Sequence, residues 1–336
     1  MQTDRTTAGL VDGFGRIHRA LRVSVTDRCN LRCRYCMPAE GMPWIPRGDV
    51  LTDDELVRVV TVLAGQGITE LRVTGGEPLV RPHLADLIAR FNAVPEIREI
   101  SLTTNGVLLA EQLDGLVAAG LSRVNVSLDS LDPDRFEALT RRRDLHRVLE
   151  GLAACERYPQ LAPIKVNAVL LRGLSEADVL PLAEFARQRP YVVRFIEVMP
   201  LDAPRDWTRE NVLSGDEVRG MVEARWPLVP LDRDRPSAPG TRFAFADGAG
   251  RLEFVSSVTE PFCAACDRLR LTADGQLRTC LFADWETDLR APLRAGISDD
   301  DLAAIAAGAV AAKGPGHGMA DPSWTYTGRP MSMIGG

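Results

Sequence analysis

The run LRVSVTDRCNLRCRYCMP, residues 21–38, decides the architecture of this chain. It begins as a short apolar strand and passes at once into three cysteines, Cys29, Cys33 and Cys36, spaced C-x3-C-x2-C. Thiolates at this density in one loop normally hold a metal or an iron–sulfur cluster. A four-iron cluster usually takes four cysteines, so three thiolates leave one iron open to bind another molecule. The spacing therefore predicts a cluster that takes part in chemistry.

A zinc site and a disulfide are the alternative uses of these cysteines. Structural zinc prefers four ligands, commonly in C-x2-C pairs, and no histidine lies near this loop. The histidines of the chain are His18, His83, His146 and His317. Nothing in the sequence suggests an exported protein, and a reducing compartment keeps thiols free for metal. An iron–sulfur cluster is the favoured interpretation.

Composition limits the partners of this protein. The chain has 336 residues, 45% of them hydrophobic, and a formal net charge of −6, which argues against a broad nucleic-acid surface but not against a small anionic substrate. Residues 1–13 are polar and lack an apolar signal segment. The longest apolar stretch, 302–312, is short of the about 20 residues that span a bilayer. We expect a cytoplasmic protein that binds neither membrane nor nucleic acid.

Short apolar strands alternate with amphipathic helices as far as Met199. The expected strands are 21–26, 69–74, 99–103, 123–128, 164–170 and 192–198. The expected helices are 53–65, 82–91, 110–119, 134–139 with 145–157, and 175–189. This alternation predicts parallel strands with right-handed crossovers. Six units are visible, whereas a closed barrel of this type has eight. We therefore expect an α/β fold, an open, partial barrel of six parallel β/α units.

Chemistry-bearing residues follow the expected strands. The cysteine loop follows the first strand, and other polar tails are GGEP at 75–78, TTNG at 103–106, SLDS at 127–130 and MP at 199–200. Each tail alone could be a helix cap or a turn. In parallel barrels, however, the active site lies at the C-terminal ends of the strands. Five tails on one rim therefore predict an active site there.

The character of the chain changes after residue 226. The segment 227–240 has four prolines and scattered charges, as expected of a linker or an extended wrap. We divide the chain into a partial barrel, 1–226, and a smaller C-terminal region, 227–336. The expected elements of this region are strands at 242–246, 251–256 and 269–272, a hairpin turn at 273–275, and helices at 286–295 and 299–312.

A second cysteine set lies in the C-terminal region. Cys263 and Cys266 form a C-x2-C pair, and Cys280 follows after thirteen residues, within reach of a hairpin. Three thiols without a nearby histidine suit either a second cluster or a zinc ion with a carboxylate such as Asp267 as the fourth ligand. The first motif favours a second cluster with an open iron. The remaining cysteine, Cys155, is expected to be a buried core thiol.

Cationic residues on the expected strands could hold an anion. Arg268 and Arg270 alternate on one strand, so both guanidinium groups can share a face, and such forks suit phosphate oxygens. Arg22, Arg72 and Lys165 also lie on strands, where inward charges would be costly without an anion. The alternative is ordinary salt bridging to Glu70, Glu99 and Glu197.

Two glycine-rich segments near the C-terminus differ from known phosphate loops. No G-x-x-x-x-G-K-[ST] motif is present, and the segment KGPGHG at 313–318 lacks that spacing and is expected to be a plain loop. The chain ends in Gly335-Gly336, which composition alone would make a frayed end. Glycines can also thread a narrow channel because they have no side chain.

These motifs together carry a family resemblance. C-x3-C-x2-C resembles the signature of the radical S-adenosylmethionine (SAM) enzymes. The runs at 21–38, 74–78 and 103–106, the Cys263/Cys266/Cys280 set with Arg268 and Arg270, and the IGG end resemble the GTP 3′,8-cyclase family of molybdenum cofactor biosynthesis. The resemblance covers nearly the whole chain. It implies a cytoplasmic radical SAM lyase that converts GTP to 3′,8-cyclo-7,8-dihydro-GTP.

The resemblance also implies two [4Fe-4S] clusters, SAM and residue roles. The implied ligands of the first cluster are Cys29, Cys33 and Cys36, and those of the second are Cys263, Cys266 and Cys280. The implied SAM contacts are Tyr35, Gly76, Ser127 and Met199. The implied GTP contacts are Arg22, Arg72, Thr103, Lys165, Arg268, Leu269 and Arg270. The implied catalytic residues are Arg268, Arg270, Gly335 and Gly336, with the glycine tail reaching into the barrel.

Other functions compete with this interpretation. A radical SAM enzyme with an auxiliary cluster could instead modify a peptide, although such enzymes usually carry more C-terminal cysteines. A non-enzymatic binding protein with two zinc sites would be colourless and free of iron. For the cyclase, the expected partners are GTP and an electron donor of the flavodoxin or ferredoxin type, and the expected state is a monomer or homodimer.

Overall fold

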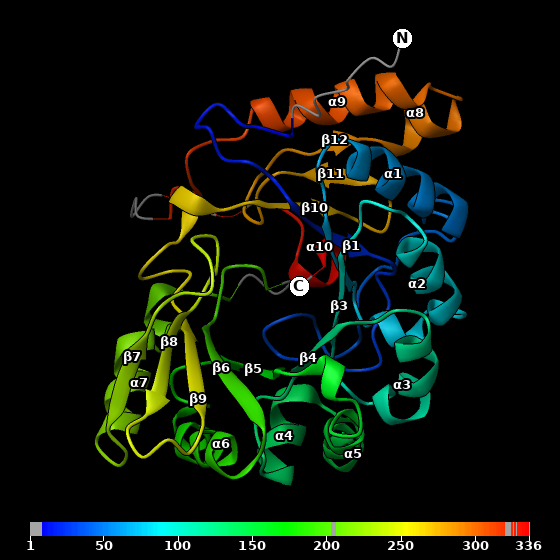
Figure 1. The fold of residues 1–336 in the computed structure, drawn as a ribbon. Coiled ribbons are helices and arrows are strands. Elements are labelled where there is room, and N and C mark those ends of the chain that lie inside the picture. Colours follow the sequence, from blue (N-terminus) through cyan, green and yellow to red (C-terminus); the bar gives the residue numbers. More distant parts are fainter. Residues whose placement is uncertain (1–8, 203–205, 320–323, 325, 327, 336) are drawn as a thin grey trace.

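The computed structural model describes residues 9–202, 206–319, 324, 326 and 328–335 and contains one twelve-stranded sheet (Figure 1). Six strands follow one another in parallel. They are β1 (Ala20–Ser24), β2 (Glu70–Thr74), β3 (Glu99–Thr104), β4 (Arg123–Ser127), β5 (Ile164–Leu170) and β6 (Tyr191–Glu197). The connecting helices are α1 (Asp53–Gly65), α2 (Leu84–Asn92), α3 (Leu109–Ala118), α4 (Pro133–Thr140), α5 (Leu145–Cys155) and α6 (Glu176–Gln188). The predicted six-unit partial barrel is confirmed.

The C-terminal region extends this sheet at both edges, which the sequence did not reveal. Next to β6 come β9 (Arg251–Val255), β8 (Thr241–Phe245) and β7 (Leu228–Leu231). Next to β1 come β10 (Arg268–Leu271), β11 (Gln276–Arg278) and β12 (Thr287–Asp288). Both β9 and β10 run parallel to their barrel neighbours, so eight parallel strands stand in a row. In the described residues the outer strands β7 and β12 do not pair, and the sheet stays open.

One expectation about the C-terminal region is refined and one is wrong. The segment 227–240, expected as a linker or an extended wrap, begins as the extended strand β7, because residues 228–231 pair antiparallel with β8. The expected helix 286–295 shortens to α8 (Arg290–Arg294), because Thr287 and Asp288 join β11 and the Asp288 carboxylate then accepts from the amide of Arg290 at 2.9 Å. The expected helix 299–312 is confirmed as α9 (Asp299–Ala311). The division of the chain at residue 226 stays a prediction.

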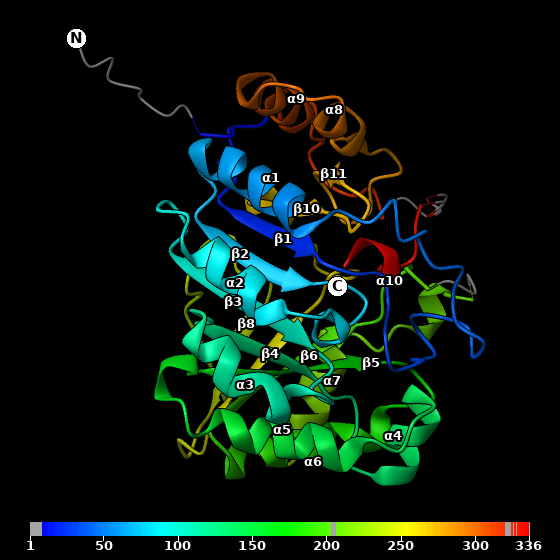
Figure 2. The ribbon, with the colours of Figure 1, turned by 90° about the vertical axis from the view of Figure 1, so that its right-hand side faces the viewer.

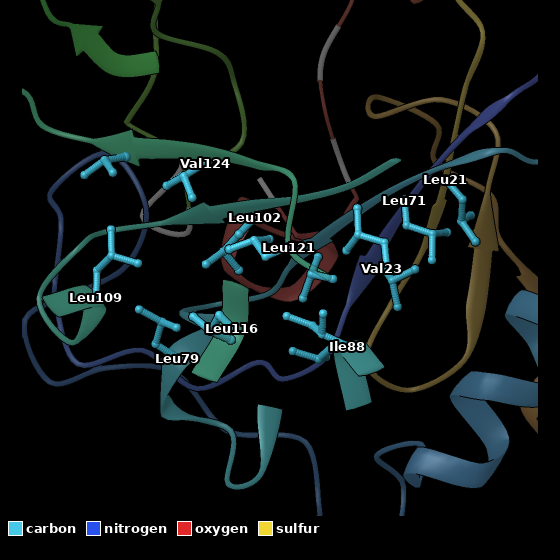
Figure 3. Close-up of a cluster of buried hydrophobic side chains, with 14 of the residues drawn as sticks. Leu21, Val23, Leu71, Leu79, Ile88, Leu102, Leu109, Leu116, Leu121 and Val124 are labelled. Atoms are coloured by element: carbon cyan, nitrogen blue, oxygen red, sulfur yellow. The ribbon is translucent and has the colours of Figure 1, made fainter. Parts of the chain in front are cut away.

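The hydrophobic core lies between the outer face of the sheet and the helices. Strand residues alternate, so Leu21, Val23 and Leu71 are buried on this face while their neighbours face inward. Figure 3 shows these strand side chains meeting those of the surrounding helices and loops, Ile88, Leu109, Leu116 and Leu121 among them. The inward positions are thereby left free to line a cavity.

The last helix lies inside the ring of strands. Helix α7 (Gly215–Glu223) follows β6, whereas the single-turn α10 (Met331–Ile334) lies at the centre of the ring in Figure 1 and beside the ends of β1 and β2 in Figure 2. The amide of Met331 donates to the carbonyl of Leu201 at 2.8 Å, which fixes the start of this turn. Among the described helices, none combines the length and apolar character needed to cross a membrane.

Candidate active site

The first cysteine loop leaves the end of β1 and is held by α4. The amides of Arg32 and Arg34 donate to the carbonyls of Thr140 and Leu139 at 3.0 and 2.9 Å, at the C-terminal end of that helix. Cys29, Cys33 and Cys36, called the first triad below, are free, half-buried thiols that line one large cavity. Burial, reinforced by the Glu77 carboxylate, raises the pKa of Cys29 to about 11, and burial raises that of Cys36 to about 12.

The tail of β2 packs tightly under this loop. A Cβ on Gly76 would lie 2.4 Å from the carbonyl oxygen of Arg28, so only glycine lets the two loops approach. The Glu77 carboxylate accepts from the Asn105 amide at 2.6 Å and the Thr104 hydroxyl at 2.7 Å. The TTNG tail of β3 is thus tied to the GGEP tail of β2, as expected for one rim.

All four predicted SAM contacts line the same cavity as the first triad. They are Tyr35, Gly76, Ser127 and Met199. The Tyr35 hydroxyl donates to Asp129 at 2.6 Å, and the other carboxylate oxygen of Asp129 accepts from the Val169 amide at 2.8 Å. Burial raises the pKa of Asp129 to about 6. Asp129 was not among the predicted site residues, although it belongs to the quoted tail 127–130.

The second triad, Cys263, Cys266 and Cys280, lines the same cavity as the first. Cys263 lies in a short 3-10 turn (Cys263–Ala265) before β10, and the β10–β11 hairpin returns the chain to Cys280. All three thiols are free and half-buried. Burial would raise the pKa of Cys266, but the charges of Lys313 and Arg268 outweigh it and lower that pKa.

The donor set of both triads fits iron–sulfur clusters. Thiolates are the protein ligands of such clusters, and each triad offers three of them on a shared cavity wall. Within the described residues, no three His, Cys, Asp or Glu side chains converge as ligands of one metal ion. A four-iron cluster does not need that convergence, because each thiolate binds a different iron.

Arginines form a row between the two triads. The strand register places Arg22 on β1 directly between Arg270 on β10 and Arg72 on β2, and all three line the cavity. Arg72 donates to Ser101 at 3.3 Å, whereas Arg22 makes no hydrogen bond or ion pair with any described residue. Burial, reinforced by repulsion from Arg270 and Arg72, lowers the pKa of Arg22 well below its ordinary value.

The carboxylates considered as alternative partners are engaged elsewhere. Glu70 pairs with Arg235, and Glu99 lies 3.5 Å from Arg123. Glu197 accepts from the Val258 amide at 2.9 Å and from Thr259. The salt-bridge alternative is therefore wrong for Arg22 and Arg72, and the cationic row lacks a carboxylate partner among the described residues.

Two predicted GTP contacts do not line the cavity. Lys165 donates to Glu253 at 2.7 Å, so its salt bridge is real but has a partner that the sequence did not suggest. Leu269 points into the hydrophobic core and is fully buried. Arg194 also pairs with Glu253, at 2.5 Å, and it lines the cavity although sequence reasoning missed it. Its inward place on β6 follows from strand alternation, which was the available signal.

Thr103 and Arg268 take their predicted places on the cavity wall, and the C-terminal tail closes one side of it. Arg270 donates to the carbonyl of Gly335, whose φ of +79° suits glycine. A Cβ there would lie 2.9 Å from the Thr74 side chain and 3.1 Å from that of Ser24. Gly335 therefore sits against the ends of β1 and β2 and is not frayed. Gly336 lies outside the described residues.

Comparison with known proteins identifies the class. Residues 23–186 match the Radical SAM superfamily, and residues 191–319 match Molybdenum Cofactor Synthesis C. The crystal structure of Streptococcus suis SuiB bound to S-adenosylmethionine superposes with a TM-score of 0.56 at 13% identity, covering 85% of this chain and 67% of that one. SuiB bound to its precursor peptide SuiA gives the same TM-score over 80% and 61%. The fold and the match over residues 23–186 are those of the Radical SAM superfamily.

Similar sequences narrow the class to one family. The GTP 3′,8-cyclase of Streptomyces coelicolor is 49% identical over 330 residues, 97% of this chain and 96% of that protein. The GTP 3′,8-cyclase of Corynebacterium glutamicum is 46% identical over 97% of this chain and 89% of that protein. The chain therefore belongs to the GTP 3′,8-cyclase family. Enzymes of this family use SAM and two [4Fe-4S] clusters.

Proposed function

We propose that this chain converts GTP to 3′,8-cyclo-7,8-dihydro-GTP, the first step of molybdenum cofactor biosynthesis. The observation that carries the proposal is the cationic row. Arg270, Arg22 and Arg72 stand side by side in a cavity that also holds both cysteine triads, and Arg22 has no partner among the described residues. Buried cations without a counterion are unfavourable, and a triphosphate supplies the missing negative charge.

We assign SAM binding to the part of the cavity beside the first triad and GTP binding to the part beside the arginine row and the second triad. When bound, SAM and the first cluster would supply the radical chemistry that activates the GTP ribose at its 3′ position. We assign the first cluster to Cys29, Cys33 and Cys36. Tyr35, Gly76, Ser127 and Met199 would hold SAM beside it, with Tyr35 oriented by its 2.6 Å hydrogen bond to Asp129.

The other side of the cavity would hold the substrate. Arginine forks bind phosphate oxygens in pairs, so Arg22, Arg72, Arg268 and Arg270 would position the triphosphate. Thr103 would contribute a hydroxyl, and Leu269 only its backbone. Lys165 would act indirectly, because it pairs with the buried Glu253 carboxylate, which also pairs with the cavity-lining Arg194. The guanine would meet the second cluster, held by Cys263, Cys266 and Cys280.

The C-terminal tail would shield the reacting atoms from water. Gly335 packs on Ser24 and Thr74 and fixes Arg270 through its carbonyl. We propose that the Gly335-Gly336 end supports the reaction by holding Arg270 against the substrate and by excluding water from the radical.

A one-electron donor must reach the first cluster. We propose an acidic carrier of the flavodoxin or ferredoxin type, in the cytoplasm. Support comes from three exposed arginines, Arg28 and Arg34 in the cysteine loop and Arg142 just after α4, in a chain whose net charge is −6. Opposite charge steers association and weakens with salt. Whether the enzyme works as a monomer or homodimer stays a prediction.

The experiment that tests the proposal is anaerobic. The reconstituted enzyme receives SAM and dithionite with GTP, with ATP or with no nucleotide, and 5′-deoxyadenosine and nucleotide products are measured. We expect 5′-deoxyadenosine to rise with GTP alone, together with a cyclised guanine product. SAM cleavage that ignores GTP would contradict the substrate and favour a peptide modifier. Absence of iron after reconstitution would favour two zinc sites.

A further inference from the structure

The loop 313–318, called the lysine loop below, packs against the second triad. A Cβ on Gly316 would lie 3.3 Å from the Cβ of Cys263, so its glycine allows a close approach. Arg16 ties the two segments together. Its guanidinium donates to the carbonyls of Cys263, Pro315 and Gly314 at 2.8, 2.9 and 2.6 Å. The segment that the sequence left as a plain loop is thus a wall of the second cysteine site.

Lys313 places a buried ammonium beside this triad. The residue is only 5% exposed, and its Nζ lies 3.1 Å from the carbonyl oxygen of Arg268, 3.5 Å from that of Cys266 and 3.8 Å from the Sγ of Cys266. The sulfur distance is that of a weak N–H···S hydrogen bond.

Within the part of the chain that the structure describes, no carboxylate neutralises the ammonium of Lys313 by direct contact. The acidic residue on the neighbouring N-terminal hairpin, Asp12, is already engaged by Arg16 at 2.6 Å and His18 at 3.0 Å. A buried cation needs an anion, and the sulfur of Cys266 is the group in contact that can carry a negative charge.

We propose that Lys313 is a positioning residue for the second cluster, donating to the Cys266 thiolate and raising the reduction potential of that cluster. The inference rests on the proposed function, because it requires a cluster at this triad. Potentials of iron–sulfur clusters depend on net charge and on hydrogen bonds to the sulfurs. A fixed cation that withdraws electron density from a ligand sulfur stabilises the reduced state, so its loss lowers the potential.

The choice of lysine at this position supports the assignment. The chain contains 40 lysines and arginines, of which Lys165 and Lys313 are the sole lysines. Arginine serves at every other cationic position, including the phosphate-facing row. An ammonium is a compact point donor that can reach two carbonyls and a sulfur at once, whereas a planar guanidinium directs its donors in a fixed fork. We therefore expect an arginine at position 313 to keep the charge but fit the site less well.

The test measures the midpoint potential of the second cluster in the reconstituted full-length enzyme by dithionite titration monitored by electron paramagnetic resonance. The signal is assigned as the one that a Cys33→Ser variant retains. Lys313→Gln keeps a donor but loses the charge, Lys313→Arg keeps the charge, and Arg90→Gln removes a surface charge outside the cavity as the control. We expect Lys313→Gln to lower the midpoint, Lys313→Arg to lower it less, and Arg90→Gln to leave it unchanged.

Several results would overturn the inference. An unchanged midpoint and spectrum in Lys313→Gln, at full iron content, would make Lys313 a structural residue. If Lys313→Gln loses the second cluster, Lys313→Arg decides: a retained cluster supports the charge, and equal loss in both variants refutes it. If the unchanged enzyme shows no signal that survives Cys33→Ser, the second cluster itself is absent, and the proposed function rather than the role of Lys313 has failed.

Discussion

The two cysteine triads face one cavity but have opposite electrostatic surroundings. Carboxylates lie around the first. Burial raises the pKa of Cys33 well above its ordinary value, and the neighbouring Asp129 raises it further. In the second triad the cations act on Cys266, where Lys313 and Arg268 overcome burial and lower its pKa, whereas burial still raises the pKa of Cys263. The same ligand type is thus placed in an electron-rich setting on one side and an electron-poor setting on the other.

This difference matches two different tasks. A cluster that must give an electron to SAM benefits from surroundings that do not stabilise extra electrons, because potential rises with positive charge nearby. A site that holds a triphosphate beside a cluster needs cations to balance the negative charge of the phosphates and of the cluster thiolates. The arginine row therefore forms one cationic group with the surroundings of Cys266, whereas the first triad lies at the polar rim of the barrel.

We expect the largest loss of activity when one cysteine of either triad is replaced, and the two triads should differ in which product is lost. Cys33→Ser should abolish both 5′-deoxyadenosine and cyclised product, because the first cluster loses a ligand. Cys266→Ser should abolish cyclisation but leave some SAM cleavage. Chromatography of both products checks this.

The control for these substitutions is Cys155→Ser in the core, away from the cavity. It should lower stability by about 1–3 kcal/mol through an unsatisfied hydroxyl yet keep both clusters. If Cys266→Ser loses as much SAM cleavage as Cys33→Ser, the proposal that only the first triad is needed for SAM cleavage is wrong.

The C-terminal tail contacts both the barrel strands and Arg270, and a substitution there should give the next largest loss of activity. Gly335→Ala brings a Cβ within 2.9 Å of Thr74 at a φ of +79°, so the turn must move and release Arg270. We expect cyclisation to fall by about 10- to 100-fold while the melting temperature changes little, since a strained alanine costs only about 1–2 kcal/mol.

Gly296→Ala is the matched control for the tail. Gly296 has a φ of +82° but open space around it, so the substitution repeats the backbone strain without the clash. Equal product formation by the two variants would show that the position of the tail does not matter.

The arginine row should lower the stability of the nucleotide-free protein and strengthen the binding of GTP. Arg22 is half-buried beside Arg270 and Arg72 without a carboxylate partner in the described structure, so Arg22→Met should raise the melting temperature of the nucleotide-free protein. It should also weaken GTP binding about 10- to 100-fold, the loss expected for one charged hydrogen-bonding group. Calorimetry measures both. A variant that is less stable and binds GTP normally would disprove the role of the row.

Local patterns predicted most of the barrel but not how its ends assemble. The spacing of the cysteines was enough to predict a cluster, whereas the sequence left open whether Arg22 faces an anion or forms an ordinary salt bridge. The pairing of β10 with β1 joins residues nearly 250 positions apart, as the register of Arg22 with Arg270 shows, and no local signal encodes such a contact. Lys313 and Asp12 were missed for the same reason, because their significance comes entirely from distant partners.

The smallest effect is a difference in pH dependence between the two sides, measured on the cluster-free protein. Burial raises the pKa of Glu77, near the first triad, from 4.5 to about 7, although hydrogen bonds oppose the shift. The folded state therefore binds this proton more tightly than the unfolded chain, and the contribution of Glu77 is present below about pH 4.5 and lost as the pH rises through about 7.

The pKa of Asp12, which shares Arg16 with the second triad, shifts in the opposite direction. Burial would raise its pKa, but hydrogen bonds from His18, Phe14 and Arg16 outweigh it and lower the pKa from 3.8 to about 2. Its contribution is present above about pH 4 and lost as the pH falls through about 2. Melting curves should therefore show that Glu77→Gln flattens the profile between pH 4.5 and 7, whereas Asp12→Asn flattens it only below pH 4. If both substitutions alter stability in the same pH range, the predicted difference between the surroundings of Glu77 and Asp12 is wrong.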